Sequence, residues 1–173
     1  MKYRKLPHID MPEHYQFVTF RTHDSLDTYL QKLYDLPLEN AKKQFIIDEH
    51  LDRSSNGAYL NGECIDIFFE VVREKEEKLY ETVACAVMPN HVHLLFRQIA
   101  PLPEAVKYIK AASAVQLNRM LGRSGRFWAR EYYDKAIRDD AHFETVYRYV
   151  VNNPVKVGLK DAEVRVYGVY GNG

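Results

Sequence analysis

Two apolar runs separated by a short turn constrain the fold of this chain more than any other feature. The runs cover residues 80–88 and 91–98, and Pro89 and Asn90 lie between them. Apolar, partly β-branched runs of this length on either side of a Pro-Asn pair are typical of strands joined by a turn. The sequence therefore predicts a β-hairpin here, and hence a sheet in the folded protein.

Two histidines lie at alternate positions at the start of the second run. Side chains alternate across a strand, so His91 and His93 project from the same face and Val92 from the other. Two neighbouring imidazoles can hold a divalent cation when another part of the chain supplies a third ligand. Half-buried histidines without a ligand show the same spacing, and Leu95 at the next alternate position rules out a longer histidine run. Spacing alone leaves both interpretations open.

Helical periodicity and strand alternation divide the remainder of the chain into further elements. The first predicted strand is 15–21, and the predicted helices are 25–36, 38–51, 65–78, 101–121 and 141–152. Residues 127–138 carry alternating aromatic residues and are predicted to form a strand or an extended arm. We expect Pro154 to end the last helix, because its ring disfavours a helical residue before it. Strands interrupted by helices predict an α+β fold with a largely antiparallel sheet.

Composition indicates one soluble globular domain, residues 1–173. Hydrophobic residues make up 46% of the chain and charged residues 28%, which is ordinary for a globular protein. No apolar run approaches the ~20 residues that cross a membrane, and no apolar segment follows the charged N-terminus, so we expect no secretory signal. Cys64 and Cys85 lie in separate apolar surroundings, which favours buried free thiols. We therefore expect a cytoplasmic protein that does not contact a membrane.

The charges are unevenly distributed although they sum to zero. Between Glu104 and Arg138, eight basic residues stand against three acidic ones. That excess suits a surface that contacts phosphates, and a solvated helix face is the alternative. The bases expected to bind DNA phosphates are Lys107, Lys110, Arg119, Arg123, Arg126 and Arg130. Phe127, Trp128 and Tyr132 offer stacking faces for bases, but these aromatic residues could equally belong to the core.

The last predicted helix carries a tyrosine and an amide on one side. Its core stripe has helical spacing and consists of Phe143, Val146, Tyr147 and Val150. Tyr149 lies about 100° from the centre of that stripe, on its shoulder, and Asn153 follows four residues later on the same side. Both could meet a sheet face that carries two histidines. A packing tyrosine and a turn residue before proline are the alternatives, and spacing does not favour Tyr149 over Tyr132, Tyr133 or Tyr147.

Three motifs together resemble one family. Met88-Pro-Asn-His-Val-His-Leu-Leu-Phe is similar to the metal-binding strand of the HUH single-tyrosine transposases. The segments 127–138 and 149–159, the second of which contains Asn-Asn-Pro-Val, resemble the REP-associated tyrosine transposase branch. The resemblance implies the ferredoxin-like, RRM-like HUH endonuclease fold. It also implies that His91 and His93 are metal ligands, that Tyr149 is the nucleophile and that Asn153 is the third ligand.

The resemblance implies a DNA transposase that cleaves and rejoins single-stranded or hairpin DNA. The intermediate would be a 5′-phosphotyrosine, and the cofactor a divalent metal, Mg²⁺ or Mn²⁺, because imidazole ligands suit manganese well. The protein would act as a monomer or a homodimer. A domesticated relative that binds hairpins without cleaving them is the main alternative. A small-nucleotide phosphoesterase fits less well, because the third histidine is missing and a basic segment is present.

The sequence departs from the family in two places. Pro12-Glu13-His14 stands where family members often have Gly-Thr at a DNA-contacting turn. Residues 38–78 also form a longer segment than in compact members, so we expect an insertion there within the single domain. Its Glu/Lys-rich helix and Asn/Gly loops have no function that the sequence assigns.

Overall fold

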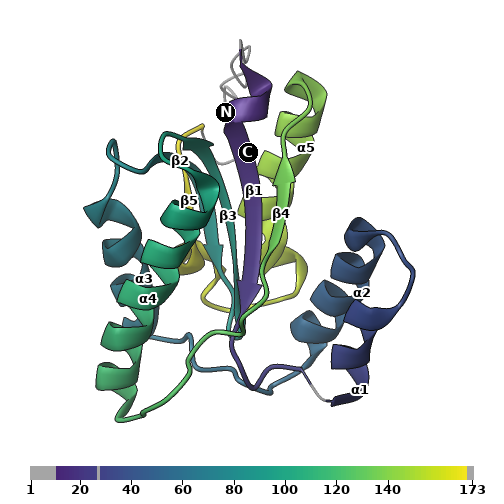
Figure 1. Cartoon of the computed structure of the whole chain (residues 1–173). Coiled ribbons are helices and arrows are strands. Elements are labelled where there is room, and N and C mark those ends of the chain that lie inside the picture. The colour runs from purple at the N-terminus through teal and green to yellow at the C-terminus, as the bar shows by residue number, and fades with distance from the viewer. Residues whose placement is uncertain (1–10, 27, 171–173) are drawn as a thin grey trace.

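One antiparallel sheet forms the centre of the molecule. The computed structural model describes residues 11–26 and 28–170 of the chain. Within these residues the strand order is β4-β1-β3-β2-β5 (Figure 1). The strands are β1 (Tyr15–Arg21), β2 (Tyr80–Val87), β3 (His91–Gln98), β4 (Tyr133–Ala136) and β5 (Val166–Gly168). The predicted first strand and the predicted hairpin are confirmed, and the three-residue β5 had no prediction.

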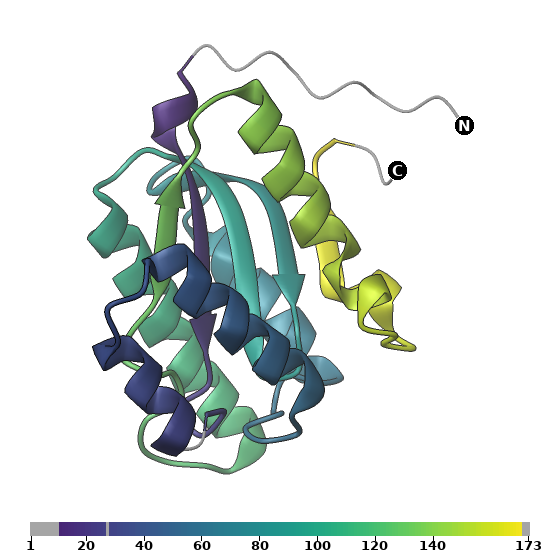
Figure 2. The ribbon, with the colours of Figure 1, turned by 90° about the vertical axis from the view of Figure 1, so that its right-hand side faces the viewer.

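Helices cover both faces of the sheet. The α-helices are α1 (Thr28–Gln31), α2 (Asn40–Arg53), α3 (Glu63–Glu74), α4 (Leu102–Leu121) and α5 (Asp140–Lys156). Short 3₁₀ turns are η1 (Pro12–His14), η2 (Lys32–Asp35) and η3 (Ala162–Arg165). Helices α3 and α4 cover one face, whereas α5 and the α1–α2 pair lie over the other (Figures 1 and 2). The arrangement confirms the predicted α+β class with a sheet that is antiparallel throughout its described strands.

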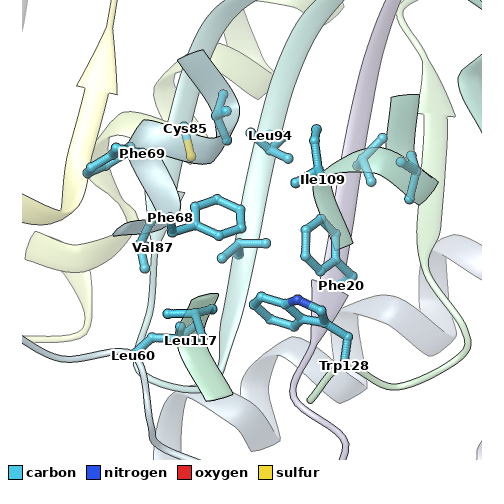
Figure 3. Close-up of a cluster of buried hydrophobic side chains, with 14 of the residues drawn as sticks. Phe20, Leu60, Phe68, Phe69, Cys85, Val87, Leu94, Ile109, Leu117 and Trp128 are labelled. Atoms are coloured by element: carbon cyan, nitrogen blue, oxygen red, sulfur yellow. The ribbon is translucent and has the colours of Figure 1, made fainter. Parts of the chain in front are cut away.

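The face under α3 and α4 holds the larger hydrophobic core (Figure 3). Phe20 packs edge-on against the Trp128 ring, with centroids 4.7 Å apart. The indole of Trp128 donates a 2.9 Å hydrogen bond to the Ser113 hydroxyl in α4, so its polar edge is satisfied inside the core. Phe127 and Trp128 are 1% and 4% exposed. These two aromatic residues are therefore core residues with no face free for a DNA base.

Residues 127–138 are an extended arm for most of their length. Trp128 forms an isolated antiparallel bridge with Thr22, and regular pairing with β1 begins only at Tyr133. The predicted helix 25–36 is also shorter than expected, since α1 begins at Thr28 and η2 follows it. Ser25 lies three residues before α1, and its hydroxyl donates to the Thr22 carbonyl at 2.6 Å. Residue 27 lies outside the described residues, as do residues 1–10, on which the expectation about a secretory signal rests.

The prediction that Pro154 ends the last helix is wrong. Helix α5 continues to Lys156 with Pro154 inside it. Pro154 is buried, and the next turn is still closed by the Val157 amide, which donates to the Asn153 carbonyl at 3.2 Å. Packing against the sheet outweighs the local preference of the residue before proline. As a result, Tyr149 and Asn153 lie one turn apart on a continuous helix.

Cys64 and Cys85 are buried free thiols, as the sequence predicts. Burial raises the pKa of both thiols, so neither is a reactive thiolate. Among the described helices, none is both long enough and apolar enough to span a lipid bilayer.

Gly57 lies where the α2–α3 loop crosses the end of β1. Its φ is +64°, and a Cβ there would lie 2.4 Å from the Thr22 hydroxyl and 3.0 Å from the Ser25 amide nitrogen. The hydroxyl cannot easily move, because it donates to the Gly57 carbonyl at 2.9 Å. Gly122 ends α4 with a similar φ of +65°, but a Cβ there would meet no atom within 4 Å.

We expect Gly57→Ala to destabilise the protein more than Gly122→Ala does. The control should lose roughly 1–2 kcal/mol for the left-handed backbone alone. Gly57→Ala should lose about 1–3 kcal/mol beyond that, since the methyl group overpacks a fixed contact. Urea denaturation of both variants measures the difference. Equal losses would show that the loop shifts freely at Gly57.

Candidate functional site

His91 lies at the start of β3 with its ring orientation fixed by its neighbour. The Asn90 amide nitrogen donates to the carbonyls of Leu51, Ser54 and Asn56 at 3.0–3.4 Å. The amide oxygen of Asn90 must then face the His91 ring, whose Nδ1 lies 2.7 Å away. An oxygen can only accept, so Nδ1 carries the proton and donates. The Nε2 of His91 therefore presents its lone pair to the inside of the site.

His93 lies two residues further along β3 on the same face, as the alternation predicts. Its Nδ1 is 2.7 Å from the hydroxyl of Thr19, the residue opposite it on β1. Its Nε2 is buried and has no hydrogen-bond partner among the described residues, and the same holds for the Nε2 of His91. Histidines that bind metal through one nitrogen are commonly held at the other in this way. His91 and His93 are both 0% exposed, so they are not half-buried surface histidines.

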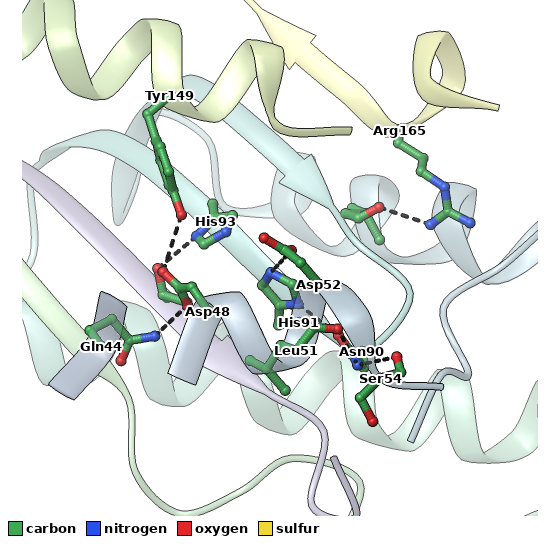
Figure 4. A network of polar contacts seen from close by, with 12 residues as sticks. Gln44, Asp48, Leu51, Asp52, Ser54, Asn90, His91, His93, Tyr149 and Arg165 are labelled. Carbon is green, nitrogen blue, oxygen red and sulfur yellow. Dashed lines mark hydrogen bonds and ion pairs between the residues drawn. The ribbon is translucent and has the colours of Figure 1, made fainter. Parts of the chain in front are cut away.

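Helix α2 brings two carboxylates to the histidines (Figure 4). Asp48 is buried; its Oδ1 accepts from Gln44 at 2.7 Å and its Oδ2 from the Tyr149 hydroxyl at 3.1 Å. Asp52 lies one turn later, with its Oδ1 3.6 Å from the Nε2 of His91. Asp48, His91 and His93 each place a potential ligand atom within 4.8 Å of the others.

Helix α5 brings Tyr149 and Asn153 to the same site. The Tyr149 ring lies 5.2 Å from the His93 ring, measured between centroids, and 6.0 Å from that of Phe17. Asn153 is buried, and its Oδ1 has no hydrogen-bond partner among the described residues. The structure thus brings together the two histidines and the tyrosine that the sequence singled out, and the asparagine lies one turn after that tyrosine on α5. Tyr132, Tyr133 and Tyr147 were alternatives by spacing, and none of them makes a ring contact with His93 among those described.

Burial determines the protonation of these groups. It lowers the pKa of His93 to about 3 and, with the adjacent His93 ring, lowers that of His91, so both imidazoles are neutral at pH 7. Burial also raises the pKa of Asp48 to about 7 and that of Asp52 to about 6. The Tyr149 hydroxyl remains a neutral phenol, because burial and the nearby Asp48 charge raise its pKa. A bound cation would suit both kinds of group. Neutral imidazoles would bind it through their free lone pairs, and its charge would stabilise the ionised form of the buried carboxylates.

The predicted DNA-contacting bases lie mostly away from this site. They lie on α4 and the loop after it, and α4 covers one face of the sheet (Figure 1). Val92 and Leu94 pack in the core on that face, so His91 and His93, at the alternate positions of β3, face the other side. Lys107, Lys110, Arg126 and Arg130 line a groove of about 590 Å³ between α4 and the extended arm. Lys110 is partly committed to structure, since its ammonium donates to the Ala129 carbonyl at 2.6 Å. Arg123 pairs with Asp24 at 3.2 Å and covers the Tyr59 ring, whereas Arg119 is exposed.

A second hollow connects two of these bases to the strand beside the site. Its volume is about 500 Å³, and Arg126 and Arg130 line it together with Arg21 and His23. Arg21 pairs with His91 in the β1–β3 register, and its buried Nε has no partner among the described residues. Of the predicted bases, Arg126 and Arg130 therefore share a hollow with a residue that lies directly opposite His91 in the sheet.

Sequence reasoning missed the two carboxylates and the orienting amide. A signal for the carboxylates was present, because Asp48 and Asp52 directly follow the buried Ile47 and Leu51 of α2. Acids at the shoulder of an apolar stripe four residues apart share a helix face that points inward. For Asn90, only its place beside His91 gave a hint, since its three carbonyl partners lie at the end of α2 and in the loop after it, far away along the chain.

Comparison with known proteins gives matches of one kind. A Haemophilus influenzae protein (strain Rd), provisionally named a REP-associated tyrosine transposase, is 33% identical over 95 residues. The alignment covers 46% of this chain, and the chain spans only about half of that relative, 52% of its length.

Solved structures also align with the chain. One is described as a REP-associated tyrosine transposase bound to a REP hairpin; it covers 91% of this chain and 75% of its own, at 17% identity and a TM-score of 0.50. Another, a provisionally named transposase of Deinococcus radiodurans, covers 88% and 97% at 19% identity and a TM-score of 0.46. The first likeness supports the fold that the strand order shows.

The match to a family model extends over the centre of the site. The model describes IS200-like transposases and matches residues 52–153, more than half of the chain. His91, His93, Tyr149 and Asn153 all fall inside this range, whereas Asp48 precedes it. The chain therefore belongs to the IS200-like transposase family.

Proposed function

We propose that the protein cleaves and rejoins single-stranded or hairpin DNA by tyrosine attack on a phosphodiester. One observation carries this proposal: the Tyr149 hydroxyl and both imidazoles meet in a single buried cluster, and the buried Asn153 lies one turn after Tyr149 on the same helix. The names of the aligned relatives point in the same direction, since two of them are REP-associated tyrosine transposases and one is bound to a REP hairpin.

The residues present fit a divalent metal. The Nε2 atoms of His91 and His93 and the Oδ1 of Asn153 are buried without partners among the described residues, and each is a common metal donor. Unpartnered buried acceptors are costly unless a cation satisfies them. We propose that these three side chains hold Mg²⁺ or Mn²⁺, which when bound would polarise a phosphate oxygen and neutralise its charge.

Tyr149 would supply the nucleophilic oxygen. In the proposed step its Oη bonds to phosphorus while the bond to the 3′-oxygen breaks, which leaves a 5′-phosphotyrosine and a free 3′-hydroxyl. The phenol proton passes to Asp48 Oδ2, the atom to which it already donates at 3.1 Å. The departing 3′-oxygen takes a proton from water, and the proton held by Asp48 neutralises the hydroxide that remains. A reversal of the same steps rejoins the strand without an external energy source.

Tyr149→Phe should abolish covalent protein–DNA adducts while leaving hairpin binding nearly unchanged, because only the attacking oxygen is lost. The measurement is a denaturing gel after incubation with single-stranded hairpins and Mn²⁺. Tyr147→Phe is the matched control, since it removes a hydroxyl from the same helix outside the cluster and should keep the adduct. An adduct that persists in Tyr149→Phe would assign the nucleophile elsewhere. Hairpin binding without any adduct in the unaltered protein would support the non-catalytic alternative.

His91→Ala should reduce strand cleavage by a factor of at least ~100, because one imidazole ligand disappears. His142→Ala, which removes an imidazole from the first turn of α5 outside the cluster, should retain full activity. The same hairpin cleavage assay, run with Mn²⁺ and again with EDTA, measures both effects. Undiminished cleavage in EDTA would eliminate the metal from the mechanism.

A further inference from the structure

We propose that α2 supplies two further ligands, the carboxylates of Asp48 and Asp52, to the metal in the DNA-free protein. The inference rests on the proposed metal centre at His91 and His93 and extends its donor set. It assigns a function to part of the segment 38–78, for which the sequence gave none. Three separate observations carry it.

The first observation is a contact between two acceptors. The Oδ1 of Asp52 lies 3.6 Å from the Nε2 of His91, and neither atom has a hydrogen-bond partner among the described residues. The Asn90 contact fixes the His91 proton on Nδ1, so Nε2 directs a lone pair toward a carboxylate oxygen. Such a pair is repulsive unless a positive charge lies between the atoms. Two donors bonded to one ion at ~2.1 Å each lie at most ~4.2 Å apart, and 3.6 Å is within that limit.

The second observation concerns Asp48. The residue is 8% exposed, and one of its carboxylate oxygens lies within 4.8 Å of the ligand atoms of both histidines. Its hydrogen-bond donors, Gln44 and Tyr149, are both neutral groups. They fix the direction of the carboxylate but leave each oxygen with a free lone pair. Asp48 can therefore bind a cation while it still holds the Tyr149 hydroxyl.

The third observation is the charge balance. No lysine or arginine in the described part of the chain makes an ion pair with Asp48 or Asp52. Paired or metal-bound carboxylates are the rule inside proteins, because an isolated buried charge is costly. Two carboxylates and two neutral imidazoles together match the charge of one divalent ion. Lys156 acts on Asp52 from beyond ion-pair distance, whereas the hydrogen-bond donors to Asp48 among the described residues are the neutral groups of Gln44 and Tyr149.

The proposal has a direct consequence for access. With both carboxylates, both imidazoles and Asn153 as donors, an ion that takes about six ligands has almost no position left for substrate. His91 and His93 are 0% exposed beneath α2. A phosphate could therefore bind the metal through more than one oxygen only by replacing a carboxylate of α2, and Asp52 is the one that can leave while Asp48 keeps the Tyr149 hydroxyl.

Mn²⁺ titration of the full chain without DNA tests the proposal. We expect Asp48→Asn and Asp52→Asn each to weaken the dissociation constant at least tenfold, measured by calorimetry, because a charged ligand becomes a neutral one. Glu49→Gln is the matched control, since it removes the same charge from an exposed position of the same helix and should change affinity less than threefold. Water-proton relaxation of the Mn²⁺ complex provides a second readout. Each Asp variant should admit water to the metal and raise the relaxation rate, which Glu49→Gln should not do.

The outcomes distinguish this inference from the proposed metal centre. If either Asp variant binds Mn²⁺ within tenfold of Glu49→Gln, or if its relaxation rate stays at the level of the control, that carboxylate is not a ligand and the proposal is overturned. Thermal unfolding in EDTA identifies variants that fail to fold, and for these Asp48→Ser or Asp52→Ser replaces the amide variant. If His91→Ala binds Mn²⁺ as tightly as the unaltered protein, the metal centre of the proposed function fails instead.

Discussion

The whole site depends on the hydrogen bonds of one buried side-chain amide, that of Asn90. Asn90 lies in the turn between β2 and β3, and its amide nitrogen donates to one carbonyl in the last turn of α2 and to two in the loop that follows this helix. These bonds anchor the end of α2 to the hairpin and at the same time orient the amide oxygen toward His91. Loop position, helix position and imidazole tautomer are thus set by one side chain. Loss of such a group leaves several buried polar atoms unpaired, each at a cost of ~1–3 kcal/mol.

Sequence reasoning was most successful where a short local pattern decides the structure. The strand at 15–21 and the hairpin at 80–98 follow from alternation and one turn, and the structure confirms both. The common face of His91 and His93 follows from the same alternation. On α5, helical spacing placed Phe143, Val146, Tyr147 and Val150 in the core, where the structure has them. Periodicity is a strong predictor because burial of one face dominates the energy of these elements.

Local patterns failed where tertiary contacts decide. Pro154 predicts a helix end, but packing of α5 on the sheet carries the helix through it. Phe127 and Trp128 lie between Arg126 and Arg130, as stacking residues of a DNA-binding arm could, yet Ser113 satisfies the indole inside the core. The carboxylates of α2 escaped notice for a related reason: their partners lie on β3 and α5, about 40 to 100 residues away along the chain. A local sequence pattern does not reveal contacts between residues so far apart along the chain.

Pro154 has a mechanical consequence for the helix that carries the tyrosine. Proline lacks the amide hydrogen that would bond to the carbonyl four residues earlier, which is that of Val150, the neighbour of Tyr149. Helices bend most easily where a rung of their hydrogen-bond ladder is missing. Helix α5 is therefore easiest to bend in the turn that joins Tyr149 to Asn153. A small movement of the tyrosine side chain would bend the helix there and leave the sheet that carries the imidazoles in place.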